Sequence, residues 1–282
     1  PQARGRFQRA IVQSAGWALQ GTATKASEEA LALELESSLL GDGGNLEALR
    51  ALPARDVFQA ARDVFRGHFF DPVIDGRTIL EPVAESVAAA RMAPVDLLIG
   101  SNADEWKMYL ADDADLDDWV NEGLPAGKRA AAEPLLATDR DPKRALDRAV
   151  SAHQMVCPSL ALAEAIHRQG GRSWAYWFTR VRPGALAEDM GAYHGAELPY
   201  LFDTHDHWLP TAAEDRVLTG RMMTYWTAFA VTGNPNGDTV GHVTPPSWPA
   251  YSGGGADVQR LDTAIRPVHH PEWPLCAVLG VN

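Results

Sequence analysis

LLIGSNADEW, at positions 97–106, joins an apolar run to a polar turn that carries two carboxylates. A short apolar run bounded by turn residues is typical of a strand buried on both faces, as in parallel sheets. Open α/β sheets place their functional residues just beyond the carboxyl ends of such strands. Glu105 stands at that position, so we expect it to be a site residue.

The rest of the chain alternates strand-like and helix-like segments. Strand patterns occur at 7–14, 68–76 and 173–179, and a terminal strand or hairpin is expected around 258–261. Helical patterns occupy 25–40, 45–52, 55–65, 126–137, 141–169 and 214–232. Cys157-Pro158 should kink or divide the helix at 141–169, because proline lacks the amide hydrogen that a helix interior needs. This alternation predicts an α/β fold with a mostly parallel central sheet flanked by helices. We find no repeat or linker that would divide residues 1–282 into separate domains.

Composition excludes several classes of function. The formal net charge is −12 and the basic residues are dispersed, so we expect no nucleic-acid partner. No run of about 18 apolar residues exists, so no membrane span is expected. The two cysteines, Cys157 and Cys276, form no Cys-x-x-Cys pair, which leaves two buried thiols or a single bridge as alternatives.

A histidine between glycines provides a second candidate site residue. The sequence GAYHGAELPY at positions 191–200 contains His194, which follows Glu105 by 89 positions. An acid followed by a histidine matches the last two members of the Ser, Asp/Glu, His order of one class of serine hydrolases. In that class the serine lies in a Gly-x-Ser-x-Gly turn between a strand and a helix. That motif occurs nowhere in the 282 residues.

Two serines partly imitate this missing nucleophile. Ser14 precedes Glu105 in the required order, but Val12 stands where the motif needs glycine. Ser173 lies in Gly171-Arg172-Ser173, which follows a helix and begins a strand, the reverse of the required context. Neither is favoured as the nucleophile.

Other clusters have simpler interpretations. His205-Asp206-His207, with Asp203 nearby, has the letters of a metal site, but a solvated loop is favoured because no second cluster completes the coordination. The aromatic residues are more simply core than a binding platform: Trp174, Trp177, Tyr225 and Trp226.

Taken together, these pieces resemble the C-terminal part of a type-B carboxylesterase, the family of cholinesterases and para-nitrobenzyl esterases. The resemblance covers most of the chain and includes FQRAIVQS at 7–14, LRALP at 49–53 and FDPVIDG at 70–76. It continues with the acid loop IGSNADE at 99–105 and the histidine loop YHGAELPYLF at 193–202. The most specific matches are this histidine loop and the closing segments YWTAFAVTGNPN, at 225–236, and WPAY, at 248–251.

The resemblance implies an α/β-hydrolase fold, of which residues 1–282 would be the C-terminal portion. It implies that Glu105 is the acid of a catalytic triad, that His194 is its general base, and that Ser14 and Glu197 form hydrogen bonds around the histidine. The nucleophile would then lie upstream of Pro1, and the chain would need the N-terminal half of the same domain as its partner. The implied activity is hydrolysis of small carboxylic esters, without a cofactor or a metal, and the chain alone is expected to be inactive.

Two features modify this expectation. Trp106 replaces the glycine that commonly follows the acid in the family, which would reshape the wall of the pocket. Cys157 and Cys276 fall where some members bridge a helix to the tail, so the resemblance favours the bridge. The rival interpretation is a non-catalytic cholinesterase-like binding module or a decayed esterase, against which the retention of both Glu105 and His194 argues.

Overall fold

The computed structural model describes residues 3–41, 43–205, 207–237 and 244–280. The chain forms two compact units. The smaller comprises residues 18–85, and the larger comprises residues 3–17 together with residues from 86 onward. Ser14, Glu105, His194 and Glu197 all belong to the larger unit.

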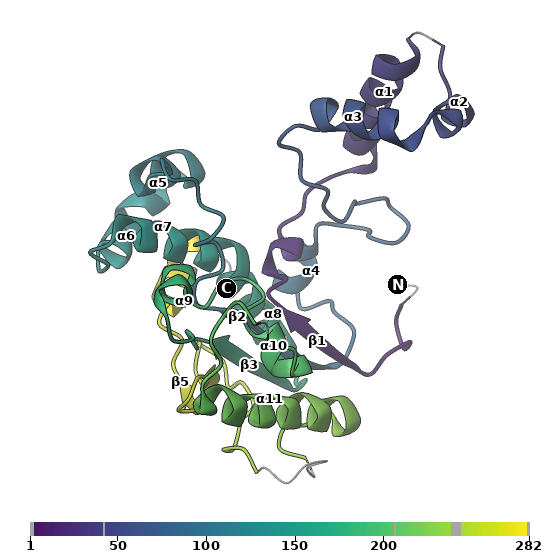
Figure 1. The fold of residues 1–282 in the computed structure, drawn as a ribbon. Helices are drawn as coiled ribbons and strands as arrows, with labels where there is room; N and C mark the ends of the chain where they lie inside the picture. The colour runs from purple at the N-terminus through teal and green to yellow at the C-terminus, as the bar shows by residue number, and fades with distance from the viewer. Residues whose placement is uncertain (1–2, 42, 206, 238–243, 281–282) are drawn as a thin grey trace. The chain divides into compact units, whose positions relative to one another are not determined.

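The larger unit is built on a sheet with the strand order β1-β2-β3-β4-β5 (Figure 1). Its strands are β1 (Arg9–Gln13), β2 (Asp96–Asn102), β3 (Ser173–Phe178), β4 (Val258–Leu261) and β5 (Arg266–Val268). The first four run parallel, and β5 turns back antiparallel to β4. The predicted α/β fold with a mostly parallel sheet is therefore confirmed, and so is the hairpin near the end of the chain.

Helices follow the strands and cover both faces of this sheet. Outside the three helices of the smaller unit, the helical elements are η1 (Gly16–Leu19), α4 (Val83–Ala88), α5 (Leu116–Gly123), α6 (Ala126–Leu136), α7 (Pro142–Ser151), the π-helical turn η2 (Ala152–Val156), α8 (Cys157–Arg168), α9 (Ala185–Met190), α10 (Leu198–Phe202), α11 (Ala213–Thr232) and α12 (Trp273–Leu279). The helix expected at 141–169 is divided by η2, directly before Cys157-Pro158.

Two apolar clusters pack on the opposite faces of the sheet. Leu97 and Ile99 face the cluster beneath α6, α8 and α12, whereas Leu98 faces the cluster beneath α10 and α11. This alternation buries β2 on both faces, as its apolar run predicted. Cys157 and Cys276 form a disulfide that joins α8 to α12 inside the first cluster. Trp174, Tyr225 and Trp226 are buried in the second cluster, which confirms the prediction that they belong to the core.

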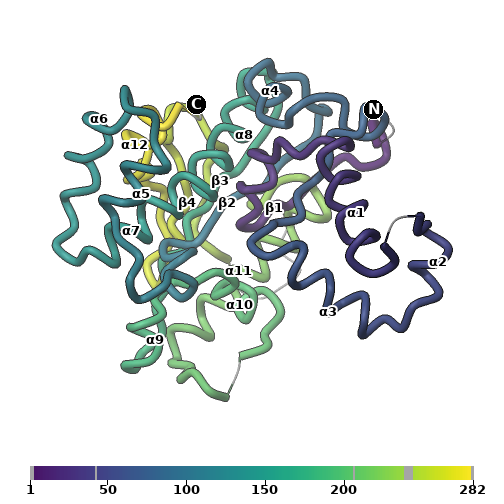
Figure 2. Tube along the Cα trace, turned by 90° about the horizontal axis from the view of Figure 1, so that it is seen from above, coloured from purple at the N-terminus to yellow at the C-terminus, as the bar shows by residue number. Residues whose placement is uncertain are grey.

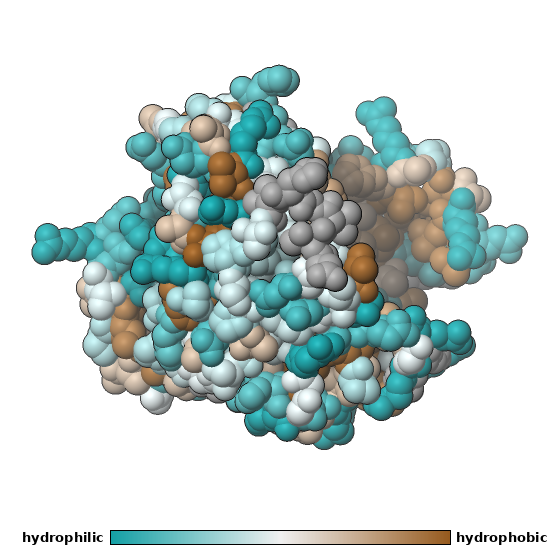
Figure 3. Space-filling view, turned by 90° about the horizontal axis from the view of Figure 1, so that it is seen from below, coloured by the Kyte–Doolittle hydropathy of each residue, from teal (hydrophilic) through white to brown (hydrophobic). Residues whose placement is uncertain are grey.

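The outward side of α11 is polar, with apolar side chains scattered singly. Val217, Met223 and Val231 are exposed there, although the helix buries Leu218, Tyr225 and Phe229 on its other side. Figure 3, seen from the side on which α11 lies in Figure 1, shows a mainly hydrophilic surface. Apolar residues that are exposed singly are normal at a protein surface and need no special explanation. Within the described ranges, no helix is both long and apolar enough to cross a membrane.

The smaller unit consists of three helices and their connecting loops. These helices are α1 (Lys25–Leu40), α2 (Leu46–Ala51) and α3 (Ala54–Val64), and α1 packs along α3 (Figure 2). Thr24 caps α1 by accepting a hydrogen bond from the Ser27 amide. The strand expected at 68–76 is wrong: only Ile74 forms a bridge there, to Thr24. Among the residues that the structure describes, no strand lies beside this segment to pair with its β-branched and aromatic residues.

Candidate active site

The acid loop leaves β2 at its carboxyl end and turns back into the protein. Glu105 lies three residues beyond the end of β2 and is 1% exposed. Residues 104 and 193 form a parallel bridge, which brings the loop of the acid alongside the loop of the histidine. The side chain of Asp104 strengthens this pairing, because its Oδ2 accepts a hydrogen bond from the Ala192 amide at 2.7 Å. This position confirms the prediction that Glu105 lies just beyond the carboxyl end of a buried strand.

His194 lies in direct contact with Glu105. The imidazole Nδ1 is 2.7 Å from Glu105 Oε2, although 89 positions separate the two residues in the chain. The histidine side chain is 40% exposed, whereas that of Glu105 is buried, so one edge of the ring reaches solvent. The hydrogen bond that His194 donates to Glu105 raises the pKa of His194 above its usual value. This geometry holds the ring in the tautomer with the proton on Nδ1, and stabilises its protonated form.

Glycine is required where the histidine loop begins. Gly191 ends α9 with φ +68°, a conformation that favours glycine. A Cβ at this position would lie 2.5 Å from Asp104 Oδ2. The close approach of the two loops therefore depends on a residue without a side chain.

The second oxygen of Glu105 is held by two donors. Ser14 Oγ and the Asn102 backbone amide both donate to Glu105 Oε1, each at 2.6 Å. Ser14 is 4% exposed and adopts φ +47°, an uncommon backbone conformation for a residue with a side chain. Its hydroxyl is occupied by a buried carboxylate and is not presented to solvent as a nucleophile would be.

Glu197 is held by a second set of donors. Its Oε2 accepts from Asn102 Nδ2 at 2.6 Å and its Oε1 accepts from Gln13 Nε2 at 3.0 Å. The same Asn102 amide also donates to the carbonyl of Tyr193. Burial raises the pKa of Glu197 above its usual value. Glu197 therefore lies near the histidine and reaches the acid loop through Asn102.

Sequence reasoning missed Gln13 and Asn102, although both lie inside segments that it singled out. Asn102 joins the acid loop to the histidine loop: its backbone amide donates to Glu105, and its side-chain amide donates to the Tyr193 carbonyl and to Glu197. Gln13 lies beside Ser14, and its Oε1 accepts from the Trp226 indole at 3.1 Å. The sequence offered one signal for each residue: Gln13 directly precedes Ser14, and Asn102 lies within the acid loop at 99–105.

The remaining sequence candidates lie elsewhere. Ser173 is buried on β3, where its hydroxyl donates to the Ala163 carbonyl. His205 Nε2 lies 2.8 Å from Thr219 Oγ1, and Asp206 of the His-Asp-His cluster lies outside the described residues. Among the residues described, no three histidine, cysteine or acidic side chains form a group that could hold a metal ion.

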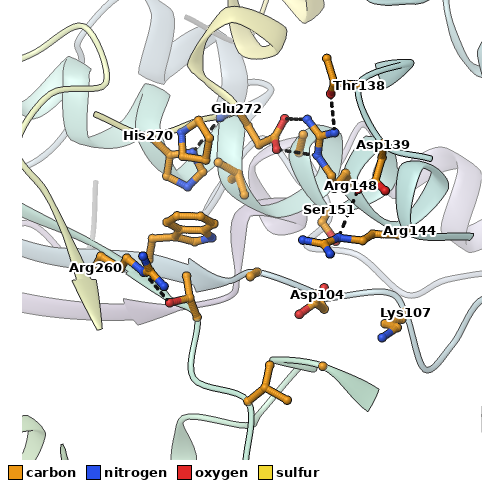
Figure 4. A pocket seen from close by; sticks show the side chains of 18 of the residues that line it. Asp104, Lys107, Thr138, Asp139, Arg144, Arg148, Ser151, Arg260, His270 and Glu272 are labelled. Carbon is orange, nitrogen blue, oxygen red and sulfur yellow. Dashed lines mark hydrogen bonds and ion pairs between the residues drawn. The ribbon is translucent and has the colours of Figure 1, made fainter. Parts of the chain in front are cut away.

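A polar cavity of about 520 Å³ lies beside Asp104, and neither Glu105 nor His194 is among its lining residues. Figure 4 shows its charged walls, in which Arg148 binds Glu272 through two hydrogen bonds. Arg144 pairs with Asp139 on the same wall. Two arginines of the cavity wall are thus paired with acids of the same wall. The cavity is separate from the contact between Glu105 and His194.

Comparison with known proteins places this geometry in a family. The model of the carboxylesterase family matches residues 1–271. The chain belongs to the carboxylesterase family. Among curated carboxylesterase relatives, acetylcholinesterase 1 of Caenorhabditis elegans is 29% identical over 89% of the chain and 48% of its own length. Para-nitrobenzyl esterase of Bacillus subtilis is 28% identical over 96% of the chain and 56% of its own length. The chain therefore spans about half the length of these relatives.

Solved structures agree on the carboxylesterase architecture. A structure described as PNB esterase is 26% identical, superposes with a TM-score of 0.76, and is matched over 99% of this chain and 59% of its own. EstA of Aspergillus niger superposes with a TM-score of 0.81 at 20% identity, which shows the fold alone. The expected α/β-hydrolase fold and the resemblance to type-B carboxylesterases are confirmed.

Proposed function

We propose that the chain supplies the acid and the base of a serine esterase that hydrolyses small carboxylic esters. The contact of 2.7 Å between His194 Nδ1 and Glu105 Oε2 carries this proposal. An imidazole hydrogen-bonded to a buried carboxylate at one nitrogen can accept a proton at the other. The membership in the carboxylesterase family supports the same chemistry.

In the proposed mechanism the nucleophile is a serine from the segment upstream of Pro1. The 282 residues contain no Gly-x-Ser-x-Gly, and the chain matches only about half of its relatives. In this proposal residues 1–282 are the C-terminal portion of one hydrolase domain, and the N-terminal half is its partner. The backbone amides that stabilise the oxyanion would come from that half as well.

The proposed reaction has two stages. His194 Nε2 takes the proton of the serine hydroxyl as the serine oxygen attacks the ester carbonyl, and then returns it to the departing alcohol. An acyl-enzyme remains, and His194 then activates water to release the acid. Throughout, Glu105 holds the ring and stabilises the imidazolium, while Ser14 and Asn102 hold Glu105. The steps require no metal and no cofactor.

Hydrolysis of p-nitrophenyl acetate tests this proposal. The chain alone is expected to match its His194→Ala variant. Together with the N-terminal half, it should hydrolyse the ester, and His194→Ala or Glu105→Gln should lower kcat/KM by on the order of 10³-fold or more. His207→Ala serves as the matched control, because this exposed loop histidine lies outside the site and should leave the rate unchanged.

Two results would contradict the proposal. Hydrolysis by the chain alone that depends on His194 would place the nucleophile within residues 1–282 and make Ser14 the first candidate. A folded assembly of both halves with no ester hydrolysis would instead favour a non-catalytic binding module.

A further inference from the structure

A second buried acid contacts the loop that carries Glu105. Asp147 lies on α7 and is 0% exposed. Its Oδ1 accepts the backbone amide of Trp106 at 2.9 Å and the Ser151 hydroxyl at 3.1 Å. Trp106 directly follows Glu105, so this contact holds the peptide unit next to the acid.

The other side of Glu105 is held as well. Asp104 Oδ2 accepts the amide of Ala192, and the Asp104 amide donates to the Ala192 carbonyl at 3.1 Å. Asp104 and Ser151 both lie at the polar cavity of Figure 4. Glu105 therefore sits between two backbone anchors, of which one leads to the histidine loop and the other to α7.

Burial of Asp147 is costly for the fold. An ionised carboxylate transferred from water to a protein interior loses several kcal/mol unless partners replace the lost hydration. Asp147 receives two such donors on Oδ1, while its buried Oδ2 has no hydrogen-bond partner in the described part of the chain. An apolar residue would pack at this helix position without that cost. An apolar residue could not replace the hydrogen bonds from Trp106 and Ser151, and of these two only the one from Trp106 reaches the acid loop.

We propose that Asp147 is a positioning residue for Glu105, which acts through the backbone amide of Trp106. The anchor fixes the acid loop relative to α7, and so fixes Glu105 Oε2 at hydrogen-bond distance from His194 Nδ1. The part that Asp147 would play in catalysis rests on the proposed esterase function. Its effect on the position of Glu105 is a property of this chain and can be measured without an activity assay.

Two substitutions separate the hydrogen bond from the charge. Asp147→Asn keeps an oxygen that can accept from Trp106. Asp147→Leu keeps the branching at Cγ, with two bulkier methyl groups in place of the oxygens, and leaves the Trp106 amide unpaired. The titration of His194 is measured by NMR on the full chain with ¹⁵N-labelled histidine, and His194→Gln assigns its signal. We expect the pKa of His194 to stay raised in Asp147→Asn and to fall toward that of an ordinary exposed histidine in Asp147→Leu.

Leu136→Ala controls for general loosening of the core. Leu136 is buried in α6 within the same apolar cluster as the α7 residue Ala149, but it lies outside the hydrogen bonds of the acid loop. This variant should lose stability and leave the His194 titration unchanged. The proposal is overturned if Asp147→Leu titrates like the wild type, or if Leu136→Ala shifts His194 as much as Asp147→Leu does. Should Asp147→Leu fail to fold, Asp147→Ala takes its place in the comparison.

Kinetics of the complete hydrolase provide the second readout. Asp147→Leu should lower kcat on the order of 10²-fold with little change in KM, because a displaced base slows proton transfer more than it weakens substrate binding. Asp147→Asn should restore most of the rate. If the wild-type assembly shows no hydrolysis, the esterase proposal fails, while the NMR comparison still decides the role of Asp147.

Discussion

Glu105 shows how a buried charge is made tolerable. The fold removes its carboxylate from water and then supplies three donors: the Ser14 hydroxyl, the Asn102 amide and His194 Nδ1. These hydrogen bonds replace part of the hydration that burial removes. Ser14 directly follows β1 and Asn102 ends β2, so the strands fix the positions of two of the three donors. Only the histidine can change its protonation state near neutral pH, because a serine hydroxyl and a backbone amide do not titrate there.

Asp147 is equally buried but has fewer donors, and both of them contact the same oxygen. Burial, followed by the nearby Asp104 carboxylate, raises the pKa of Asp147 to about 7. The hydrogen bonds from the Trp106 amide and the Ser151 hydroxyl oppose this shift. In the unfolded chain the same carboxyl titrates near 3.8. Between these values the folded protein binds the proton more tightly, so the contribution of Asp147 to stability falls as the pH rises and is constant above about 7.

The unfolding free energy of Asp147→Asn should reveal this dependence. Relative to the wild type, the variant should gain stability between pH 4 and pH 8, by up to about 4 kcal/mol, because asparagine needs no proton to stay neutral. Urea unfolding at several pH values measures the difference. The same substitution at Asp113, an exposed loop acid, is the control and should show no comparable gain. A constant difference between Asp147→Asn and the wild type across this range would contradict the assignment.

At the scale of elements, the π-helical turn η2 has a clear origin in the sequence. Pro158 has no amide hydrogen and cannot donate to the Gln154 carbonyl, so the regular helix pattern fails at that point. The Cys157 amide instead donates to the Ala152 carbonyl, five residues back. Gly16 packs against the turn so closely that a Cβ there would lie 2.4 Å from the Met155 carbonyl oxygen. The π-helical turn can therefore approach this closely only because residue 16 has no side chain.

The disulfide between α8 and α12 should contribute measurably to stability. It closes a loop of 119 positions, which on the chain-entropy model stabilises the fold by about 5 kcal/mol. Reduction of the wild type should lower Tm, whereas the double variant Cys157→Ala/Cys276→Ala should be insensitive to reductant. Thiol titration in denaturant should detect no free thiol before reduction and two after it. Two free thiols without reductant would show that the bridge does not form.

At the scale of the whole molecule, the sheet presents an unpaired side. In the part of the chain that the structure describes, β1 is the terminal strand and pairs only with β2. Phe7 and Ile11 are exposed at this strand, at 44% and 37%. An open strand edge with apolar side chains invites pairing with another chain. The proposed partner is the N-terminal half of the same hydrolase domain, which would continue the parallel sheet.

The association state of the chain tests whether the open edge of β1 pairs with another chain. Alone, it should self-associate, and Ile11→Lys should raise the monomer fraction, since lysine on an edge strand disfavours further pairing. Val231→Lys, on the exposed side of α11, adds the same charge and should have no such effect. Light scattering after size exclusion gives the masses. Addition of the N-terminal half should convert the wild type to a one-to-one complex, and a fully monomeric wild type would contradict the prediction.

Local patterns in the sequence determined the elements and the pair of residues at the centre of the site. The apolar run before Glu105 predicted β2, and the order of Glu105 and His194 predicted that they meet, because parallel strands bring their carboxyl ends to one edge. The family resemblance added Ser14 and Glu197, and the tertiary structure alone decided that Gln13, Asn102 and Asp147 also hold the two loops. Asp147 lies 42 positions from Glu105, and in the sequence it resembles any acid of a charged helix. Segment 68–76 has strand-forming residues, but the described part of the chain offers it no partner strand. Hydrogen bonds between distant segments depend on how the elements pack, and no periodicity along the chain records that packing.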